Sequence, residues 1–268
     1  MTTAPRTIVL ITGANQGIGF EVAKAIHSVH KDYHILLGSR DAERGVKAAA
    51  EIDPTGTSVE PITIDVTDDA SIEKAAEQVA SNHGRLDVLV NNAGINNEFE
   101  LFWGAQEKQK NGEAQDEKPN LSQLRQLYRE AYEVNLFGAA ATTEVFIPLL
   151  EKAAASPPRI VFVSSHTGSL AIRTDPSHEM FSKMSRPSFP IYRSSKAALN
   201  MLTLHYAAQF KDQGWKVNAS CPNLTATNFS HGIGRPASES AVNIVRLATL
   251  GADGESGLYS DENGVVPW

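Results

Sequence analysis

Tyr192 and Lys196 stand four residues apart, and the apolar residues that follow them have helical spacing. Side chains at positions i and i+4 lie on one face of a helix, so the phenol and the ammonium group share the same space. A nearby positive charge favours the phenolate and lowers the pKa of the tyrosine, which suits it to exchange protons near neutral pH. The same spacing also occurs on ordinary solvated helix faces, so the pair gains meaning only from the elements around it.

A glycine-rich turn near the N-terminus is the first of these elements. Residues 7–11 form an apolar run typical of a buried parallel strand, and helical spacing begins after residue 19. Between them the glycines follow the pattern G-x-x-x-G-x-G, which is either an ordinary strand–helix turn or a cradle of backbone N–H groups for a pyrophosphate. The predicted cofactor contacts in this turn are Gly13, Asn15, Gln16, Gly17, Ile18 and Gly19.

The ends of the second and third expected strands should meet the adenosine half of a dinucleotide. An acidic residue at the end of the second strand binds the free 2′-hydroxyl of NAD(H), but this chain has Ser39 and Arg40 there. A guanidinium group suits a 2′-phosphate, which predicts a preference for NADP(H), although Arg40 could also be a surface residue. Asp65, followed by Val66, is placed either to meet the adenine edge or to cap the next helix.

Polar residues also follow the later strands. Asn91, Ala93 and Gly94 form either a simple turn or a wall of the cofactor site. Asn135 ends an apolar helical stretch, and we expect it to face inward with hydrogen-bond partners. Ser165 follows the strand at residues 159–163, where open α/β sheets bind ligands.

Composition limits the classes of protein. The chain of 268 residues has 24 basic and 31 acidic side chains and a net charge of −7, which argues against nucleic acid or an anionic membrane as a partner. The single cysteine, Cys221, allows no intrachain disulfide and is expected to be a small buried residue. Without a signal peptide or a long apolar run, the expected location is cytoplasmic, and no metal is expected among the site residues.

The order of the elements predicts the fold. Seven strands alternate with helices and no break in composition divides them. This pattern indicates one α/β domain over residues 1–268, a doubly wound Rossmann fold with a mostly parallel seven-stranded sheet and helices on both faces. Residues 96–120 are charged and glycine-punctuated, and are expected to form an exposed excursion. Residues 166–190, rich in proline and large apolar side chains, are either a substrate-covering loop or surface padding.

Together these motifs resemble the single-domain short-chain dehydrogenases/reductases over essentially the whole chain. The matching residues, in the family's order and spacing, are Thr12, Gly13, Gly17, Gly19, Asp65, residues 91–94, Asn135, Ser165, Tyr192 and Lys196. The resemblance implies that Tyr192 exchanges a proton with a carbonyl or alcohol oxygen, and that Ser165 hydrogen-bonds the same oxygen. It implies that Lys196 binds the nicotinamide ribose and lowers the pKa of Tyr192, and that Asn135 holds a water relaying protons to Lys196.

The chain is most similar to the carbonyl-reductase-like, NADP(H)-dependent branch, through Arg40, its final four residues and a long segment between Ser165 and Tyr192. This likeness implies NADP(H) as cofactor, a small carbonyl or alcohol as substrate, and a monomer rather than a dimer or tetramer. Apolar residues in the loops favour a bulky apolar ketone, aldehyde or quinone; they are Met180, Phe181, Met184, Phe189 and Phe229.

Two positions depart from the family pattern. Asn223 stands where the family usually has glycine, and asparagine tolerates the left-handed region better than other side chains do. Gln16 replaces a basic residue common in NADP(H) members. The further implied cofactor contacts are Pro222, Leu224, Thr225 and Thr227. Two alternatives stay open: an alcohol dehydrogenase working oxidatively in a biosynthetic pathway, and a non-catalytic NADP(H)-binding protein, against which the intact catalytic set counts.

Overall fold

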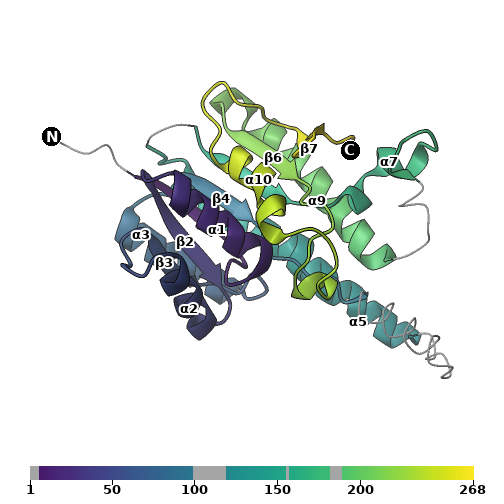
Figure 1. The fold of residues 1–268 in the computed structure, drawn as a ribbon, viewed down its shortest axis with the longest axis horizontal. Helices are drawn as coiled ribbons and strands as arrows, with labels where there is room; N and C mark the ends of the chain where they lie inside the picture. Colours follow the sequence, from purple (N-terminus) through teal and green to yellow (C-terminus); the bar gives the residue numbers. More distant parts are fainter. Residues whose placement is uncertain (1–5, 99–118, 155–156, 182–188) are drawn as a thin grey trace.

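The computed structural model describes residues 6–98, 119–154, 157–181 and 189–268. Its strands form one eight-stranded sheet in the order β3-β2-β1-β4-β5-β6-β7-β8 (Figure 1). The strands are β1 Thr7–Ile11, β2 Tyr33–Ser39, β3 Val59–Thr63, β4 Val88–Asn91, β5 Arg159–Val163, β6 Lys216–Ser220, β7 Tyr259–Asp261 and β8 Gly264–Val265.

The strand count differs from the predicted seven by one. Strands β1 to β7 pair in parallel, as predicted, while β8 pairs antiparallel with β7. Residues 262 and 263 make the tight turn between them. The C-terminal strand and turn read from the sequence therefore form a hairpin, which adds one short strand at the sheet edge.

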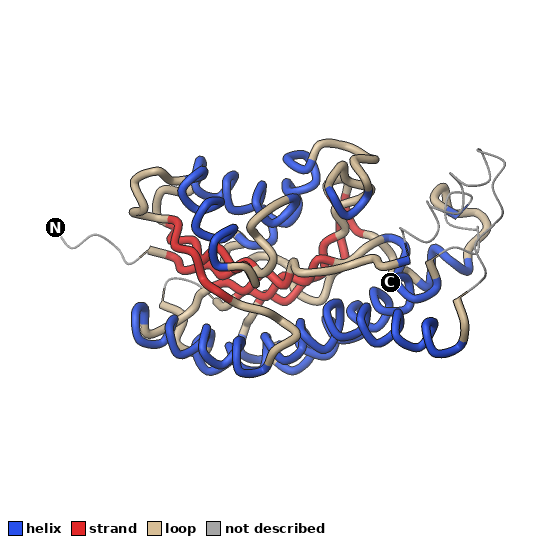
Figure 2. Tube along the Cα trace, turned by 90° about the horizontal axis from the view of Figure 1, so that it is seen from below, coloured by secondary structure: helices blue, strands red, loops and turns tan. Residues whose placement is uncertain are grey.

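Helices cover both faces of the sheet, as Figure 2 shows from the side. The α-helices are α1 Gly17–Val29, α2 Ala42–Ile52, α3 Asp69–His83, α5 Leu121–Tyr132, α6 Gly138–Leu150, α7 Leu170–Thr174, α9 Pro190–Gln209 and α10 Ala237–Ala248. Short helical turns are η1 Glu133–Phe137, η2 His166–Gly168, η3 Lys211–Gln213 and η4 Asn228–Ser230.

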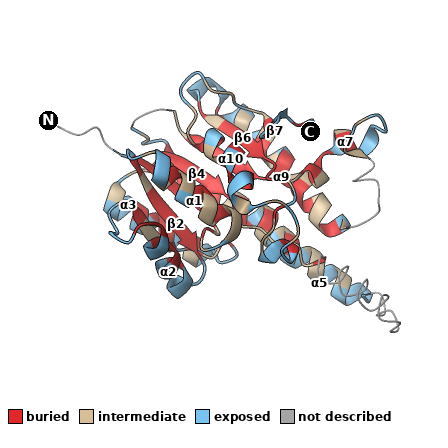
Figure 3. Ribbon diagram, viewed as in Figure 1, coloured by how far each residue is buried: buried red, intermediate tan, exposed pale blue. Residues whose placement is uncertain are grey.

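Alternation along the strands divides the core into two layers. In β1, Ile8 and Leu10 pack in the layer that contains α3, α6 and α9, whereas Val9 and Ile11 pack in the layer that contains α1, α2 and α10. Successive side chains of a strand point to opposite faces, so a strand buried on both sides must be apolar throughout. Strands β1, β4 and β5 are accordingly buried throughout and β2 nearly so, while the outer surfaces of the helices are exposed (Figure 3). This confirms the doubly wound α/β architecture.

A π-helical turn interrupts the long helical stretch that begins at Leu121. Asn120 caps α5 by accepting a hydrogen bond from the backbone N–H of Gln123. The helix then passes through η1, which contains Asn135, before continuing as α6. Single π turns inside α-helices occur frequently at functional sites because they re-aim one side chain.

The two segments expected to be irregular are partly covered. Most of the predicted excursion at residues 96–120 lies outside the described residues, as does Met184 of the predicted loop at residues 166–190. The described part of that loop contains η2 and α7. Among the residues that the structure covers, no helix combines the length and hydropathy needed to cross a bilayer.

Candidate active site

A cavity of about 960 Å³ opens at the carboxyl ends of the parallel strands. Its wall contains the ends of β2 and β5 and the turns after β1, β4 and β6, so distant parts of the chain meet there. Most of the predicted site residues line it: Gly13, Asn15, Gln16, Gly17, Ile18, Ser39, Arg40, Asp65, Val66, Ala93, Gly94, Ser165, Tyr192, Lys196, Pro222, Leu224, Thr225 and Thr227. The topology thus brings the glycine turn and the Tyr192–Lys196 pair into one space.

Three predicted residues are absent from this lining: Gly19, Asn91 and Asn135. Asn91, the last residue of β4, donates from Nδ2 to Thr143 Oγ1 at 3.0 Å. Strand alternation turns it toward α6 and gives the cavity-facing position to Asn92 instead. The side chain of Asn91 is therefore buried against α6 and faces away from the cavity, and the role of Asn91 as a cofactor contact stays a prediction.

The glycine turn is held open and close to its neighbours. Gly17 has φ of +61°, in the left-handed region that favours glycine. A Cβ atom on Gly19 would stand 2.5 Å from Asn92 Nδ2, so this glycine allows the turn to pack against the turn after β4. The N-terminus of α1, at Gly17 and Ile18, borders the cavity.

Asn92 and Thr12 fasten these two turns together. Asn92 Nδ2 donates to the carbonyl oxygens of Thr12 and Gly13 at 2.8 and 3.2 Å, and Thr12 Oγ1 accepts from the N–H groups of Asn92 and Ala93. Asn92 was missing from the predicted contacts although it belongs to the motif at residues 91–94. The sequence feature that could have pointed to Asn92 is the pair of adjacent asparagines after the strand.

The end of the cavity beside β2 carries two arginines. Arg40 lines this end, and Arg44, which was not among the predicted contacts, lines it one helical turn later. Arg44 Nε lies 3.4 Å from Asp41 Oδ2, and Ser39 Oγ donates to the carbonyl of Asp41 at 2.7 Å. A cluster of two guanidinium groups at one rim makes this end of the cavity suited to an anion.

Asp65 does not cap the next helix. Its carboxylate accepts from Thr67 N and Oγ1 at 3.0 and 2.8 Å, while Asp68 supplies the cap of α3. Of the two alternatives read from the sequence, the N-cap is therefore wrong. Asp65 instead shapes the turn that lines the cavity.

Tyr192, Ser165 and Lys196 meet at the other end. The hydroxyl of Ser165, which lies 2.9 Å from Thr167 Oγ1, also neighbours the phenol of Tyr192 and lowers its pKa as a hydrogen-bond partner. Lys196 Nζ lies 5.8 Å from the centroid of the Tyr192 ring and donates to the carbonyl oxygen of Val163 at 2.8 Å. The i, i+4 spacing on α9 thus places the phenol and the ammonium group on one face, beside the hydroxyl of Ser165.

The direction of the tyrosine pKa shift differs from the prediction. Removal from water raises the pKa of Tyr192 well above its usual value, and the hydrogen bond from Ser165 offsets only part of this rise. Burial also lowers the pKa of Lys196 to about 8, because the charged ammonium is disfavoured inside the protein. The pKa of Tyr192 rises because burial of the phenol outweighs the other effects on it. The ammonium group of Lys196 is directed to the carbonyl oxygen of Val163.

The lowered pKa of Lys196 predicts a pH dependence of stability. An unfolded lysine keeps its proton up to about pH 10.4, whereas the folded one loses it near pH 8. Between these values the unfolded chain binds more protons, so the free energy of unfolding rises with pH. We expect Lys196→Met to remove about 1 kcal/mol per pH unit of this rise between about pH 8 and 9.

Urea unfolding at several pH values would measure both proteins. Cys221, whose pKa burial raises to about 11, is present in both and cancels from their difference. Parallel curves for the two proteins across this range would contradict a lowered pKa for Lys196.

Asn135 lies behind the cavity wall, buried as expected and fully partnered. Its Nδ2 donates to Ile95 O at 2.9 Å and to Ser195 Oγ at 3.0 Å, while Oδ1 accepts from Ile95 N at 2.8 Å. Both amide hydrogens are thus engaged with protein. A water held by this side chain would have to donate to the second lone pair of Oδ1.

The loop after β6 keeps its shape without glycine. Asn223 has φ of +61°, as the asparagine at a left-handed position predicts. Cys221 is buried, as predicted, and its sulfur accepts from His166 N at 3.1 Å and Asn223 N at 3.4 Å. His166, which sequence reasoning missed, lines the cavity with Nε2 3.3 Å from Asp261 Oδ2.

Apolar side chains surround the tyrosine end. Phe229 contacts Tyr192 edge-on with ring centroids 5.6 Å apart, and Met180 and Phe189 also line the cavity. Phe181, also expected near the substrate, is absent from the lining. This end of the cavity therefore has a polar centre with apolar walls.

The chain is similar to known proteins over nearly its whole length. The family model described as short chain dehydrogenase matches residues 7–177 and 179–237. The short-chain dehydrogenase anuI of Penicillium roqueforti is 37% identical over 270 residues, which covers 99% of this chain and 98% of that protein.

Solved structures give the same result. Salutaridine reductase from Papaver somniferum is 30% identical, with a TM-score of 0.75 over 95% of this chain and 99% of that one. The NADPH-bound carbonyl reductase from chicken fatty liver shares the fold at 23% identity, with a TM-score of 0.76 over 99% of this chain and 100% of that one.

Proposed function

The chain belongs to the short-chain dehydrogenase family and is an oxidoreductase, and from this premise we propose that it uses NADPH to reduce an apolar carbonyl compound to an alcohol. The observation that carries the proposal is the meeting of Ser165, Tyr192 and Lys196 inside the cavity that also contains the glycine turn. Fold alone would not support a reaction, because one fold hosts many functions. The proposal rests on the site.

The residues of the cavity fit a dinucleotide. The turn containing Gly13 and Gly17 offers backbone N–H groups and the N-terminus of α1 to a pyrophosphate. Gly94 keeps space at the nicotinamide end, since a Cβ there would stand 3.3 Å from Asn135 Oδ1 and 3.4 Å from Lys196 Nζ. We assign the contacts with the nicotinamide half to Lys196, Pro222, Leu224, Thr225 and Thr227.

The charge at the adenosine end supports NADP(H) over NAD(H). Arg40 and Arg44 line this end. The carboxylate of Asp41, which also lines it, forms an ion pair with Arg44. A 2′-phosphate would receive charge-assisted hydrogen bonds there, whereas a free ribose hydroxyl would gain little from guanidinium groups. Arg44 offers the second cation that Gln16 does not supply.

When bound, the nicotinamide would supply a hydride to the carbonyl carbon. The residues of the chain would bind the carbonyl oxygen and give it a proton. Ser165 donates a hydrogen bond to that oxygen and stabilises the negative charge that develops on it. Tyr192, whose raised pKa keeps its phenol protonated at neutral pH, gives the oxygen its proton. The ammonium of Lys196 then stabilises the resulting phenolate, because it lies close to the ring.

The return of a proton to Tyr192 is assigned to Lys196 and Asn135. A pKa of about 8 lets Lys196 give up a proton near neutral pH without a large free-energy cost. Asn135 is fixed by its bonds to Ile95 and Ser195, so its free lone pair keeps a constant position behind the lysine. A water accepting from Lys196 and donating to Asn135 would connect the site to solvent.

The apolar wall indicates the class of substrate. Met180, Phe189 and Phe229 would bury the hydrocarbon part of a ketone, aldehyde or quinone against Tyr192. Burial of apolar surface contributes about 25 cal/mol per Å², so larger apolar carbonyls should bind more tightly than small ones.

Absorbance at the NADPH band with a panel of aromatic and aliphatic carbonyls tests the proposal. We expect oxidation of NADPH with several aromatic ketones or quinones, lower KM for the larger compounds, and much slower turnover with NADH. Failure of every carbonyl while alcohols are oxidised with NADP⁺ would favour the oxidative alternative. Tight NADPH binding without turnover in either direction would favour a non-catalytic binding protein.

A further inference from the structure

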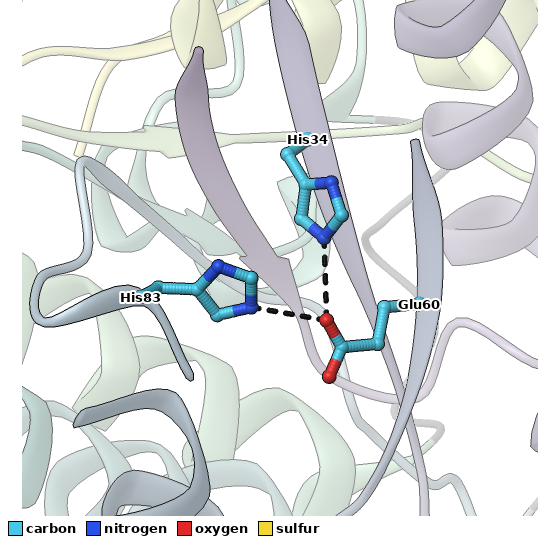
Figure 4. A group of neighbouring side chains, drawn as sticks. All are labelled: His34, Glu60 and His83. Atoms are coloured by element: carbon cyan, nitrogen blue, oxygen red, sulfur yellow. Dashed lines mark hydrogen bonds and ion pairs between the residues drawn. The ribbon is translucent and has the colours of Figure 1, made fainter. Parts of the chain in front are cut away.

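Two histidines and a glutamate converge at the edge of the sheet opposite the cavity (Figure 4). His34 is the second residue of β2, Glu60 is the second residue of β3, and His83 is the last residue of α3. All three therefore lie at the amino ends of the strands or beside them. The dinucleotide cavity lies at the carboxyl ends, so the two sites are separate.

The geometry of the three side chains matches that of a metal site. Glu60 Oε2 lies 3.3 Å from His34 Nε2 and 3.0 Å from His83 Nε2, and the ligand atoms of the group all lie within 4.8 Å of one another. Bonds of about 2.0–2.1 Å to a tetrahedral Zn²⁺ place neighbouring ligand atoms roughly 3.3 Å apart. The ion would thus need only small movements of these side chains.

The surroundings hold the glutamate and leave room for one more ligand. Gln78 Nε2 and Asn82 Nδ2 each lie 3.4 Å from Glu60 Oε1, so the second carboxylate oxygen is anchored by α3 while Oε2 faces the histidines. Such outer partners orient metal ligands. The side chains of His34 and His83 are 17% exposed and that of Glu60 is 26% exposed, so solvent can reach the fourth position.

The chemistry of the ligands selects the ion. Imidazole nitrogens suit zinc and its neighbours among the transition metals, whereas magnesium and calcium prefer oxygen ligands. The carboxylate of Glu60 offsets part of the charge of a divalent ion.

We propose that His34, Glu60 and His83 bind one zinc ion, which fastens the C-terminal end of α3 to strands β2 and β3. Without the ion, both imidazoles donate to the same carboxylate oxygen, and this shared acceptor already brings three elements together. The ion replaces both protons and joins the same three elements by coordination. Its role is structural, because the reacting groups lie at the other end of the strands.

Titration of chelator-treated protein with zinc chloride, followed by calorimetry, tests the site. We expect one ion per chain with a Kd of about micromolar or tighter, no comparable heat with magnesium, and a rise in Tm of about 5 °C at zinc well above Kd. His83→Ala and Glu60→Gln should each weaken zinc binding by more than the roughly 10–100-fold expected for loss of an outer partner. Both variants should keep their activity with NADPH.

His205→Ala is the matched control, since His205 is exposed on α9 and is not part of this group. It should bind zinc as the unchanged protein does. X-ray absorption at the zinc edge should show nitrogen and oxygen neighbours at about 2.0–2.1 Å. Glu60→Gln keeps the size of the side chain, so it tests the site even if His83→Ala fails to fold. Absence of a stoichiometric zinc event in the unchanged protein, or equal affinity in the His83 and Glu60 variants, would reduce the cluster to a hydrogen-bonded contact and overturn the proposal.

Discussion

Replacement of Tyr192 by phenylalanine should lower kcat/KM for carbonyl reduction by about 10²–10⁴-fold while the affinity for NADPH stays nearly unchanged. The phenol is the group beside the hydroxyl of Ser165, and its loss removes the proton that the reduced oxygen requires. The phenylalanine ring keeps the edge-on contact with Phe229, which preserves the wall of the cavity. Steady-state rates and fluorescence titration with NADPH would separate the two effects.

Tyr206→Phe is the matched control for this change. Tyr206 lies on the same helix, α9, and its hydroxyl donates to Glu144 at 2.7 Å, away from the cavity. It should keep its activity, apart from the modest stability cost of one lost hydrogen bond. Near-normal turnover in Tyr192→Phe would show that another group protonates the oxygen, and the assignment of the proton donor would be abandoned.

Local patterns were sufficient for much of the fold and the site. The spacing of Tyr192 and Lys196 needs only a helix to bring the two side chains together, and α9 supplies it. The glycines after β1 predict a phosphate-binding turn because they stand between a strand and a helix, and this order can be read from the sequence. Apolar runs bounded by turn residues were likewise enough to locate the parallel strands.

Properties that depend on several distant segments were not predictable. The direction of the pKa shift of Tyr192 follows from its removal from water by the packed cavity wall, not from its helical neighbour Lys196. The orientation of Asn91 toward α6 and of Asn92 toward the glycine turn follows from the position at which β4 ends. His34 and His83 come together only when β2 and α3 pack at the same edge of the sheet. Their proximity therefore could not be predicted from a sequence motif.

Loss of Arg40 should remove most of the preference for NADPH. A hydrogen bond to a charged group contributes about 1.5–3 kcal/mol, so Arg40→Ala should lower kcat/KM with NADPH by about 10–150-fold and leave the value with NADH nearly unchanged. Arg44 lines the same rim one turn later, so the double variant Arg40→Ala, Arg44→Ala should lose more than either single change. The two losses should not add fully, because both groups would bind one phosphate.

Charge reversal sharpens the same test. Arg40→Asp places a carboxylate where a 2′-phosphate would be repelled and a free hydroxyl could be bound, so this variant should prefer NADH. Arg125→Ala, which removes an exposed arginine from α5, controls for the general loss of positive charge. Increasing salt should weaken NADPH binding in the unchanged protein more than in Arg40→Ala, because exposed charge pairs are screened. Equal losses with both cofactors in Arg40→Ala would mean that the guanidinium orders the turn after β2 and does not recognise the phosphate.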